Sequence, residues 1–225
     1  MHTENLSASK NDRQRAQRMG VAPSASLRPH FLSLARQTRA WAHATDKAAV
    51  TPCNVGVTSL ARNSGNSTVA YNLAVAMTSI ARSKVLLVEA DFGRHFISRR
   101  LGSARKLGLS ELLSGIADFE ETLCDNPITN LDVIGCGQVS EADSLELPFD
   151  ELPSVINHSF ADYRYTFFDL PTASNLSTCY SVLPALDGVI LNVEANQIDQ
   201  KQIARFRRSM GMLDVPIIGM VINKQ

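Results

Sequence analysis

The stretch from Val57 to Met77, VTSLARNSGNSTVAYNLAVAM, combines a β-rich run, a polar loop and a helical pattern, in the order typical of a phosphate-binding loop. A helix beginning near Ser67 would offer unpaired N–H groups and the positive end of its dipole to an anion. Gly65 allows the backbone to approach a phosphate closely, and Ser67 stands where a P-loop hydroxyl holds Mg²⁺. The P-loop lysine, however, is replaced by Asn66.

An asparagine at this position can donate a hydrogen bond but brings no charge to the outer phosphates of a nucleotide. Loss of one charge-assisted contact costs about 1.5–3 kcal/mol, or roughly ten- to a hundredfold in affinity. The penalty is larger in a transition state that gathers charge. Nucleotide binding therefore survives the replacement more readily than catalysis does. The alternative interpretation is an ordinary polar loop followed by a Ser or Thr helix cap.

Acidic residues end two further strand-like runs. Glu89 and Asp91 end KVLLVEAD, and Asp169 ends YTFFD, as a magnesium-holding aspartate does in phosphoryl-transfer enzymes. A single aspartate after a strand is usually a turn residue. Together with the polar loop after Ser59, these two acidic strand ends make three features at one edge of a sheet, which favour a nucleotide-type site. We predict Glu89, Asp91 and Asp169 as its catalytic carboxylates, and Ser67, Asp91 and Asp169 as ligands of Mg²⁺.

The elements that must position these residues alternate along the chain. Apolar runs predict strands at 54–59, 84–91, 130–137, 163–171, 187–195 and 215–225. Helical patterns cover 31–44, 67–82, 108–115, 149–161, 176–184 and 200–213. This alternation predicts an α/β fold: a doubly wound, mostly parallel sheet with helices on both faces, in three layers. In such a sheet a ligand lies beyond the carboxyl ends of the strands.

Composition narrows the function classes. The chain has 225 residues, with 22 acidic and 22 basic side chains. Its zero net charge therefore provides no overall electrostatic attraction to nucleic acid or anionic lipid. No apolar run approaches the ~18 residues of a membrane span, and the polar start is no secretory signal. The four cysteines show no metal-ligand spacing, which suits a reducing cytoplasm. We predict a flexible arm over 1–28 and one P-loop-like domain over 29–225.

Six blocks in order make the chain resemble one family, the bacterial tyrosine kinases of capsule and exopolysaccharide synthesis. That family is related to the chromosome-partitioning and division-site ATPases. The blocks are TSLARNSGNSTVAYNLA, KVLLVEADFGRH, LGLSELLSG, NLDVIGCG, YRYTFFDLPTAS and the pair DGVILNVEA and IIGMVINKQ. The resemblance spans about residue 31 to the end and implies the P-loop ATPase fold with ATP or ADP and Mg²⁺ as ligands.

The resemblance also implies roles for single residues. Ser67 and Thr68 match the hydroxyl positions for Mg²⁺ and phosphate, and Asp169 matches the Walker B aspartate. Asp91 matches the second carboxylate of the second motif, whose first aspartate is replaced by Glu89.

At three other positions the comparison concerns the nucleotide. Asn223 matches an asparagine that contacts adenine in the partitioning ATPases. Asn66 stands for the catalytic lysine, and Arg62 is a candidate for a substitute charge. With Gly65, Ser67 and Thr68, these three residues complete the predicted nucleotide site.

Other family features are eroded. The family has a Glu-x-x-Arg-x-x-Arg oligomerisation motif. In this sequence both arginines are present as Arg36 and Arg39, but Ser33 replaces the glutamate. The tyrosine-rich tail is missing, since the sequence stops at Gln225. The chain thus resembles a degenerate kinase.

Three functions remain open at this stage. The first is a cytoplasmic, kinase-like protein of exopolysaccharide synthesis and export, with weak or no ATP turnover. It would act with a membrane chain-length, co-polymerase or export protein, associate with the membrane through that partner, and form a homo-oligomer if the eroded motif still works. The second is an active tyrosine kinase or ATPase with a variant P-loop. The third is a positioning ATPase that binds DNA or membrane through its arm, although no nucleic-acid partner is expected from the neutral composition.

Overall fold

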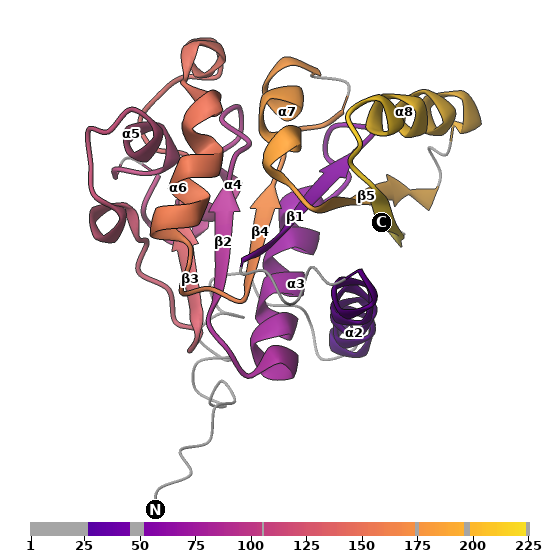
Figure 1. Cartoon of the computed structure of the whole chain (residues 1–225). Helices are drawn as coiled ribbons and strands as arrows, with labels where there is room; N and C mark the ends of the chain where they lie inside the picture. Colours follow the sequence, from indigo (N-terminus) through magenta and orange to yellow (C-terminus); the bar gives the residue numbers. More distant parts are fainter. Residues whose placement is uncertain (1–26, 46–51, 105, 174–175, 196–198, 224–225) are drawn as a thin grey trace, which may run out of the picture.

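The computed structural model describes residues 27–45, 52–104, 106–173, 176–195 and 199–223, which form a six-stranded, wholly parallel sheet between helices (Figure 1). The strand order is β3-β2-β4-β1-β5-β6. The strands are β1 (Cys53–Ser59), β2 (Val85–Glu89), β3 (Leu131–Ile134), β4 (Tyr165–Asp169), β5 (Gly188–Glu194) and β6 (Ile217–Asn223). All six predicted strands and the three-layer α/β class are confirmed.

Helices cover both faces of this sheet. They are α2 (Arg28–Ala44), α3 (Asn66–Ala81), α4 (Phe96–Arg100), α5 (Leu109–Leu113), α6 (Leu152–Ser159), α7 (Leu176–Val182) and α8 (Gln200–Met212). Helices α2 and α3 pack side by side on one face, whereas α5, α6, α7 and α8 contribute side chains to the core on the other face (Figure 1). Four short 3₁₀ turns complete the described elements: Phe119–Thr122, Asp143–Glu146 (η2), Phe149–Glu151 (η3) and Leu183–Ala185.

The apolar runs of the sequence reflect strands that are buried on both sides. In β2, Val85 and Leu87 join the core under α2 and α3, while Leu86 and Val88 join the opposite core. Each of these four side chains is fully buried. A strand of a parallel sheet covered on both faces requires this continuous hydrophobicity.

Helix α3 connects the first strand to the candidate site. It begins at Asn66, directly after Gly65, whose φ of 79° is left-handed. It ends before Arg82, also left-handed with a φ of 52°. Most of its side chains are buried between the sheet and α2, so its amino-terminal end is held rigidly at the edge of the sheet.

Two details differ from the sequence-based predictions. Helix α4 was not predicted, because its five residues are too few to show a helical period. The helix predicted from residue 149 begins with the 3₁₀ turn η3, and α6 proper starts at Leu152 with Pro153 in its first turn, where a missing N–H is tolerated.

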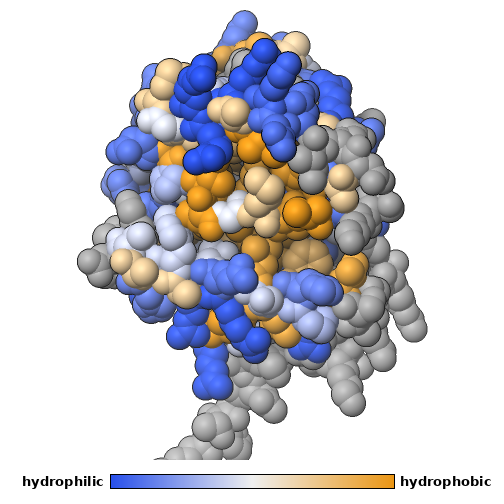
Figure 2. Space-filling model, turned by 90° about the vertical axis from the view of Figure 1, so that its right-hand side faces the viewer, coloured by the Kyte–Doolittle hydropathy of each residue, from blue (hydrophilic) through white to orange (hydrophobic). Residues whose placement is uncertain are grey.

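Strand β6 lies at the edge of the sheet and leaves apolar side chains on the surface. Met220 and Ile222 are 46% and 55% exposed. Figure 2, which views this side of the molecule, shows apolar residues gathered at the centre of the face and hydrophilic residues above and below them. None of the described helices is long and apolar enough to cross a membrane. The predicted arm over 1–28 falls outside the described residues up to 26, and Arg28 is already the first residue of α2.

Candidate functional site

The parallel register brings the predicted carboxylates to one edge of the sheet. Asp169 at the end of β4 pairs with Glu89 at the end of β2, and on its other side with Val57 of β1. Asp91 follows two residues after the end of β2. Three segments distant in sequence therefore meet where the strands of a doubly wound sheet present their ligands.

The polar loop between β1 and α3 is held by two asparagines of strands β5 and β6. Asn192 of β5 and Asn223 of β6 each donate a hydrogen bond from Nδ2 to the carbonyl of Ser64, at 2.8 Å and 3.1 Å. Within the loop, the hydroxyls of Ser59 and Ser64 both donate to the carbonyl of Ala61. The structure thus fixes the loop through its backbone carbonyls.

Asn66, at the lysine position, points inward from the start of α3. Its Nδ2 lies 2.9 Å from the carbonyl of Val57, 2.8 Å from the carbonyl of Leu170 and 3.0 Å from Oδ1 of Asp169. The side chain is 7% exposed. Its amide therefore binds the ends of β1 and β4 and is not directed at the space in front of the loop.

Asp169 is fully buried, and burial raises the pKa of its carboxyl well above the usual value. The nearby Ser67 hydroxyl opposes this shift in pKa, whereas the carboxylates of Glu89 and Asp91 add to it. Oδ2 of Asp169 has no hydrogen-bond partner among the described residues. A carboxylate oxygen left unpaired beside a serine hydroxyl is a fitting donor pair for Mg²⁺, which prefers oxygen ligands and retains several waters.

Glu89 is also fully buried, but both of its oxygens are engaged by backbone. Oε1 accepts a hydrogen bond from the N–H of Ile97 at 2.6 Å, and Oε2 accepts one from Ser98 at 3.2 Å. These are N–H groups of the first turn of α4, which has no intrahelical partners for them. Glu89 thus anchors α4 to the end of β2, and its oxygens are not free for a metal ion.

Asp91 faces a small cavity in front of the loop. The cavity has a volume of about 170 Å³ and is lined by Arg62, Asn63, Asp91, Gly93, Arg94, Glu141, Pro171 and Thr172. Burial raises the pKa of Asp91, an effect that Arg94 partly opposes. Typical ligand pockets measure about 300–1,000 Å³, so this cavity is nearer the size of a phosphate group than of a nucleotide.

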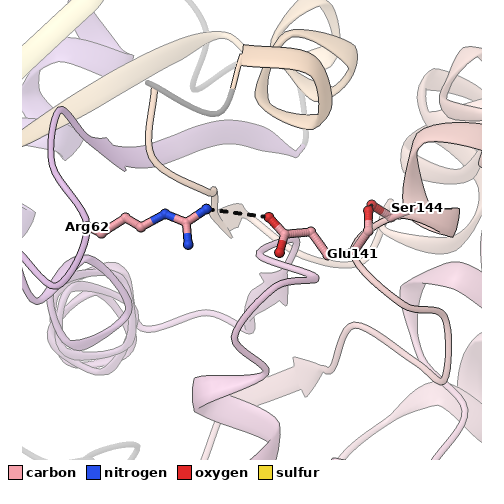
Figure 3. A network of polar contacts seen from close by, with 3 residues as sticks. All are labelled: Arg62, Glu141 and Ser144. Carbon is pink, nitrogen blue, oxygen red and sulfur yellow. Dashed lines mark hydrogen bonds and ion pairs between the residues drawn. The ribbon is translucent and has the colours of Figure 1, made fainter.

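An ion pair joins two of the residues that line this cavity. Arg62 Nη2 lies 3.9 Å from Oε1 of Glu141, while the hydroxyl of Ser144 donates to the carbonyl of Glu141 at 2.7 Å (Figure 3). The side chains of Arg62 and Glu141 are 72% and 47% exposed. At such exposure an ion pair contributes little to stability, so Arg62 can exchange Glu141 for an anionic ligand at low cost.

The other predicted site residues are placed unequally. Gly65 and Ser67 lie at the start of α3, and the Ser67 hydroxyl is close to Asp169. The side chain of Thr68 is exposed on the helix surface. Asn223 lies at the far edge of the sheet and contacts the loop backbone.

The sequence patterns did not predict Arg94, Glu141 or Asn192 as site residues. A signal was available only for Asn192, an amide in the otherwise apolar run VILNV.

Together the described residues offer a loop and helix start suited to phosphate, two oxygen donors suited to Mg²⁺ in Ser67 and Asp169, and Asp91 at the cavity beside them. They offer no ammonium in the P-loop position.

The chain is 27% identical over 173 residues to tyrosine-protein kinase CpsD of Streptococcus pneumoniae, covering 76% of this chain and 75% of that protein. CpsD of Streptococcus agalactiae is 25% identical over 174 residues, with similar coverage. Both of these relatives are bacterial tyrosine kinases. The succinoglycan biosynthesis transport protein ExoP of Rhizobium meliloti is 21% identical over 174 residues, and there the match spans 22% of a much longer protein. No protein-family model matches the chain.

Solved structures of such kinases share the fold. The kinase domain of VpsO superposes with a TM-score of 0.72 at 22% identity, covering 90% of this chain and all of that domain. The kinase domain of Escherichia coli ETK gives 0.70 at 23% identity, covering 83% and 73% of the two chains. The septum site-determining protein MinD of Pyrococcus horikoshii, complexed with Mg-ADP, gives 0.63 at 21% identity and coverages of 77% and 70%. The chain therefore shares the fold of these kinase domains and of MinD.

Proposed function

We propose that residues 29–225 form a degenerate kinase-like domain of exopolysaccharide synthesis and export, with weak or no ATP turnover. It acts through contact with a membrane chain-length or export protein, which holds it at the cytoplasmic face of the membrane. The observation that carries the proposal is the inward orientation of Asn66. The residue at the lysine position is neutral, and its donors are taken by Val57, Leu170 and Asp169.

Residual nucleotide binding is compatible with this arrangement. The N–H groups at the start of α3 and the hydroxyl of Ser67 would meet the phosphates, and Ser67, Asp91 and Asp169 would hold Mg²⁺. Without an ammonium, the negative charge that gathers on a transferring phosphoryl group is left without its usual partner. The site therefore favours weak binding of ATP or ADP over phosphoryl transfer.

Calorimetry with ATP and ADP in the presence of Mg²⁺ tests this proposal on the native chain, Asn66→Lys and Asn66→Gln. The Gln variant is the matched control, because it keeps an amide and adds no charge. We expect weak or undetectable binding by the native chain and by Asn66→Gln, and about a ten- to hundredfold gain for Asn66→Lys. Single-turnover phosphorylation of the native chain or of a partner by ATP would contradict the degenerate assignment.

A working enzyme is the second candidate, favoured by the position of Arg62. Its guanidinium lines the same cavity as Asp91 and is held only by an exposed ion pair, so it is able to approach a phosphate. If Arg62 replaces the lysine, ATP hydrolysis by the native chain is measurable and is lost in both Arg62→Ala and Asp169→Asn. Hydrolysis that persists in Asp169→Asn would come from a contaminant and count against this candidate.

A further inference from the structure

Helix α8 carries a basic surface. Its sequence, QKQIARFRRSMGM, holds four basic residues and no acidic one. Arg205, Arg207 and Arg208 are exposed, and no acidic side chain in the described part of the chain forms an ion pair with them. Such a surface attracts an acidic ligand or an acidic protein segment.

A groove between α7 and α8 adjoins this basic surface. It encloses about 440 Å³ and is lined by Leu60, Ala173, Tyr180, Gln202, Arg205, Phe206, Arg208 and Ser209. The side chains of Ala173 and Phe206 are buried, and Leu60 and Tyr180 are partly exposed. The arginines are exposed, which places them at the rim of an apolar floor. The groove therefore suits a segment that carries an apolar side chain flanked by carboxylates.

The chain itself presents such a segment. Residues 141–151, EADSLELPFDE, hold five acidic residues and no basic one. Leu145 is 56% exposed on η2, and the neighbouring Glu146 and Asp150 are exposed as well. An exposed leucine flanked by carboxylates is therefore complementary to the groove, whose floor is apolar and whose rim is basic.

We propose that this acidic segment of one copy docks into the α7–α8 groove of a second copy. Leu145 would enter the apolar floor, and the carboxylates that flank it would pair with Arg205 and Arg208. The zero net charge of the chain imposes no long-range repulsion between copies. Complementary charge on two different patches of the same chain thus favours self-association over a foreign partner.

The positions of the two patches determine the kind of assembly. Elements η2 and η3 contact α7, whereas the groove lies between α7 and α8. In Figure 1, α6, which follows the segment directly, and α8 lie on opposite sides of α7. Two different surfaces meet in each contact, so the contact is heterologous and copies add head to tail, to a ring if the rotation closes and to a filament if it does not.

The contact would also adjoin the candidate site. Leu60 lines the groove and begins the polar loop, and Glu141 begins the acidic segment and pairs with Arg62. Assembly would therefore flank the site from both sides. This inference does not depend on whether the site turns over ATP.

Sedimentation equilibrium of the full chain at low and high salt tests the proposal. We expect concentration-dependent association of the native chain that weakens at high salt, because exposed charges are screened. Arg205→Glu/Arg208→Glu and Glu146→Lys/Asp150→Lys should each weaken association more than about tenfold. Arg207→Glu is the matched control on the same helix, since Arg207 does not line the groove, and should associate as the native chain does. Circular dichroism of each variant verifies that it is folded.

The most decisive experiment mixes the two double variants in equal amounts. Each variant keeps one native patch that complements the other variant, and the two reversed patches complement one another as well. Association that is absent from either variant and returns on mixing would support the contact. A native chain that stays monomeric at low salt, or double variants that associate as the native chain does, would overturn it.

Discussion

The side-chain amide of Asn66 lies 3.0 Å from Oδ1 of Asp169 and ties the start of α3 to the end of β4. The same Nδ2 also reaches the carbonyls of Val57 and Leu170, so its two hydrogens are shared among three acceptors. The residue that departs most from the kinase pattern therefore supports the fold at the centre of the site. The neutral amide of Asn66 donates to these buried oxygens. A charged lysine turned toward a phosphate would leave the same oxygens without a donor.

Asn66→Ala should lower the free energy of unfolding by about 1–3 kcal/mol, since it leaves buried acceptors of β1 and β4 without their donor. Urea denaturation measures the change. Thr68→Ala, two residues along the same helix, is the matched control, because the Thr68 side chain is exposed. The control should stay within about 0.5 kcal/mol of the native chain. Equal stability of Asn66→Ala and the native chain would mean that the three contacts contribute nothing net.

Asp169→Asn should change how stability depends on pH. Burial raises the folded-state pKa of Asp169 above the value of about 3.9 expected in the unfolded chain. The stability contributed by this group is therefore fully present below the unfolded pKa and is lost as pH rises through the folded pKa. The asparagine keeps an oxygen for Asn66 and does not titrate. Urea denaturation from about pH 4 to pH 8 should show the variant gaining stability relative to the native chain as pH rises. A difference that is constant over this range would show that Asp169 does not titrate within it.

The sequence predicted the fold because each strand carries its own signal. A run such as KVLLVEAD can be buried on both faces only in a covered parallel sheet, and it is followed by a helical pattern. Helix α4 was not predicted, because a five-residue helix is too short to show a helical period. It is instead held by Glu89, which belongs to a different element. Contacts between distant segments leave no local pattern in the sequence.

The site was predicted as a set of residues but not as a set of orientations. Strand ends at one edge follow from topology, so Asp169, Glu89 and Asp91 were placed together. Whether Asn66 faces phosphate or the sheet depends on acceptors supplied by Val57 and Leu170, over a hundred residues apart. Likewise, Glu89 keeps the family's charge in the sequence, yet its longer side chain reaches the backbone of α4.

The carbonyl of Ser64 accepts hydrogen bonds from the side-chain amides of Asn192 and Asn223. Removal of these amides should loosen the polar loop. Asn192 is fully buried and Asn223 only partly so. We expect Asn192→Ala to destabilise the chain by about 1–3 kcal/mol and Asn223→Ala by about 1 kcal/mol or less. Hydrogen exchange of residues 60–65 should become faster in both variants and fastest in the double variant. Exchange that is unchanged in Asn192→Ala would show that the loop is held by its own serine contacts.

Gly56 of β1 is a position where a larger residue would have to displace neighbouring side chains. A Cβ there would lie 2.7 Å from Cδ1 of Leu186 and 2.8 Å from Cδ1 of Leu170. Gly56→Ala should therefore cost about 1–3 kcal/mol of stability through overpacking. Gly211 in α8 is the matched contrast, since a Cβ there meets nothing within 4 Å. Gly211→Ala should stabilise by about 0.5–1 kcal/mol, because alanine favours the helix. Thermal unfolding of both variants measures the opposite signs, and two shifts of the same sign would contradict the packing argument.

Substitution of Glu89 tests whether the carboxylate at the end of β2 supports the structure or binds the ligand. Glu89→Gln keeps the volume but loses the charge, and its amide NH₂ would face an N–H donor of α4. Removal of charge-assisted hydrogen bonds from a buried site should lower the free energy of unfolding by about 1.5–3 kcal/mol. Urea denaturation measures this loss, and hydrogen exchange over 94–102 locates it. Glu120→Gln, an exposed glutamate, is the control and should change stability by less than about 0.5 kcal/mol. If Glu89→Gln instead leaves stability and exchange at α4 intact but abolishes Mg²⁺-dependent nucleotide binding, the carboxylate serves the ligand, and its contacts with Ile97 and Ser98 are secondary.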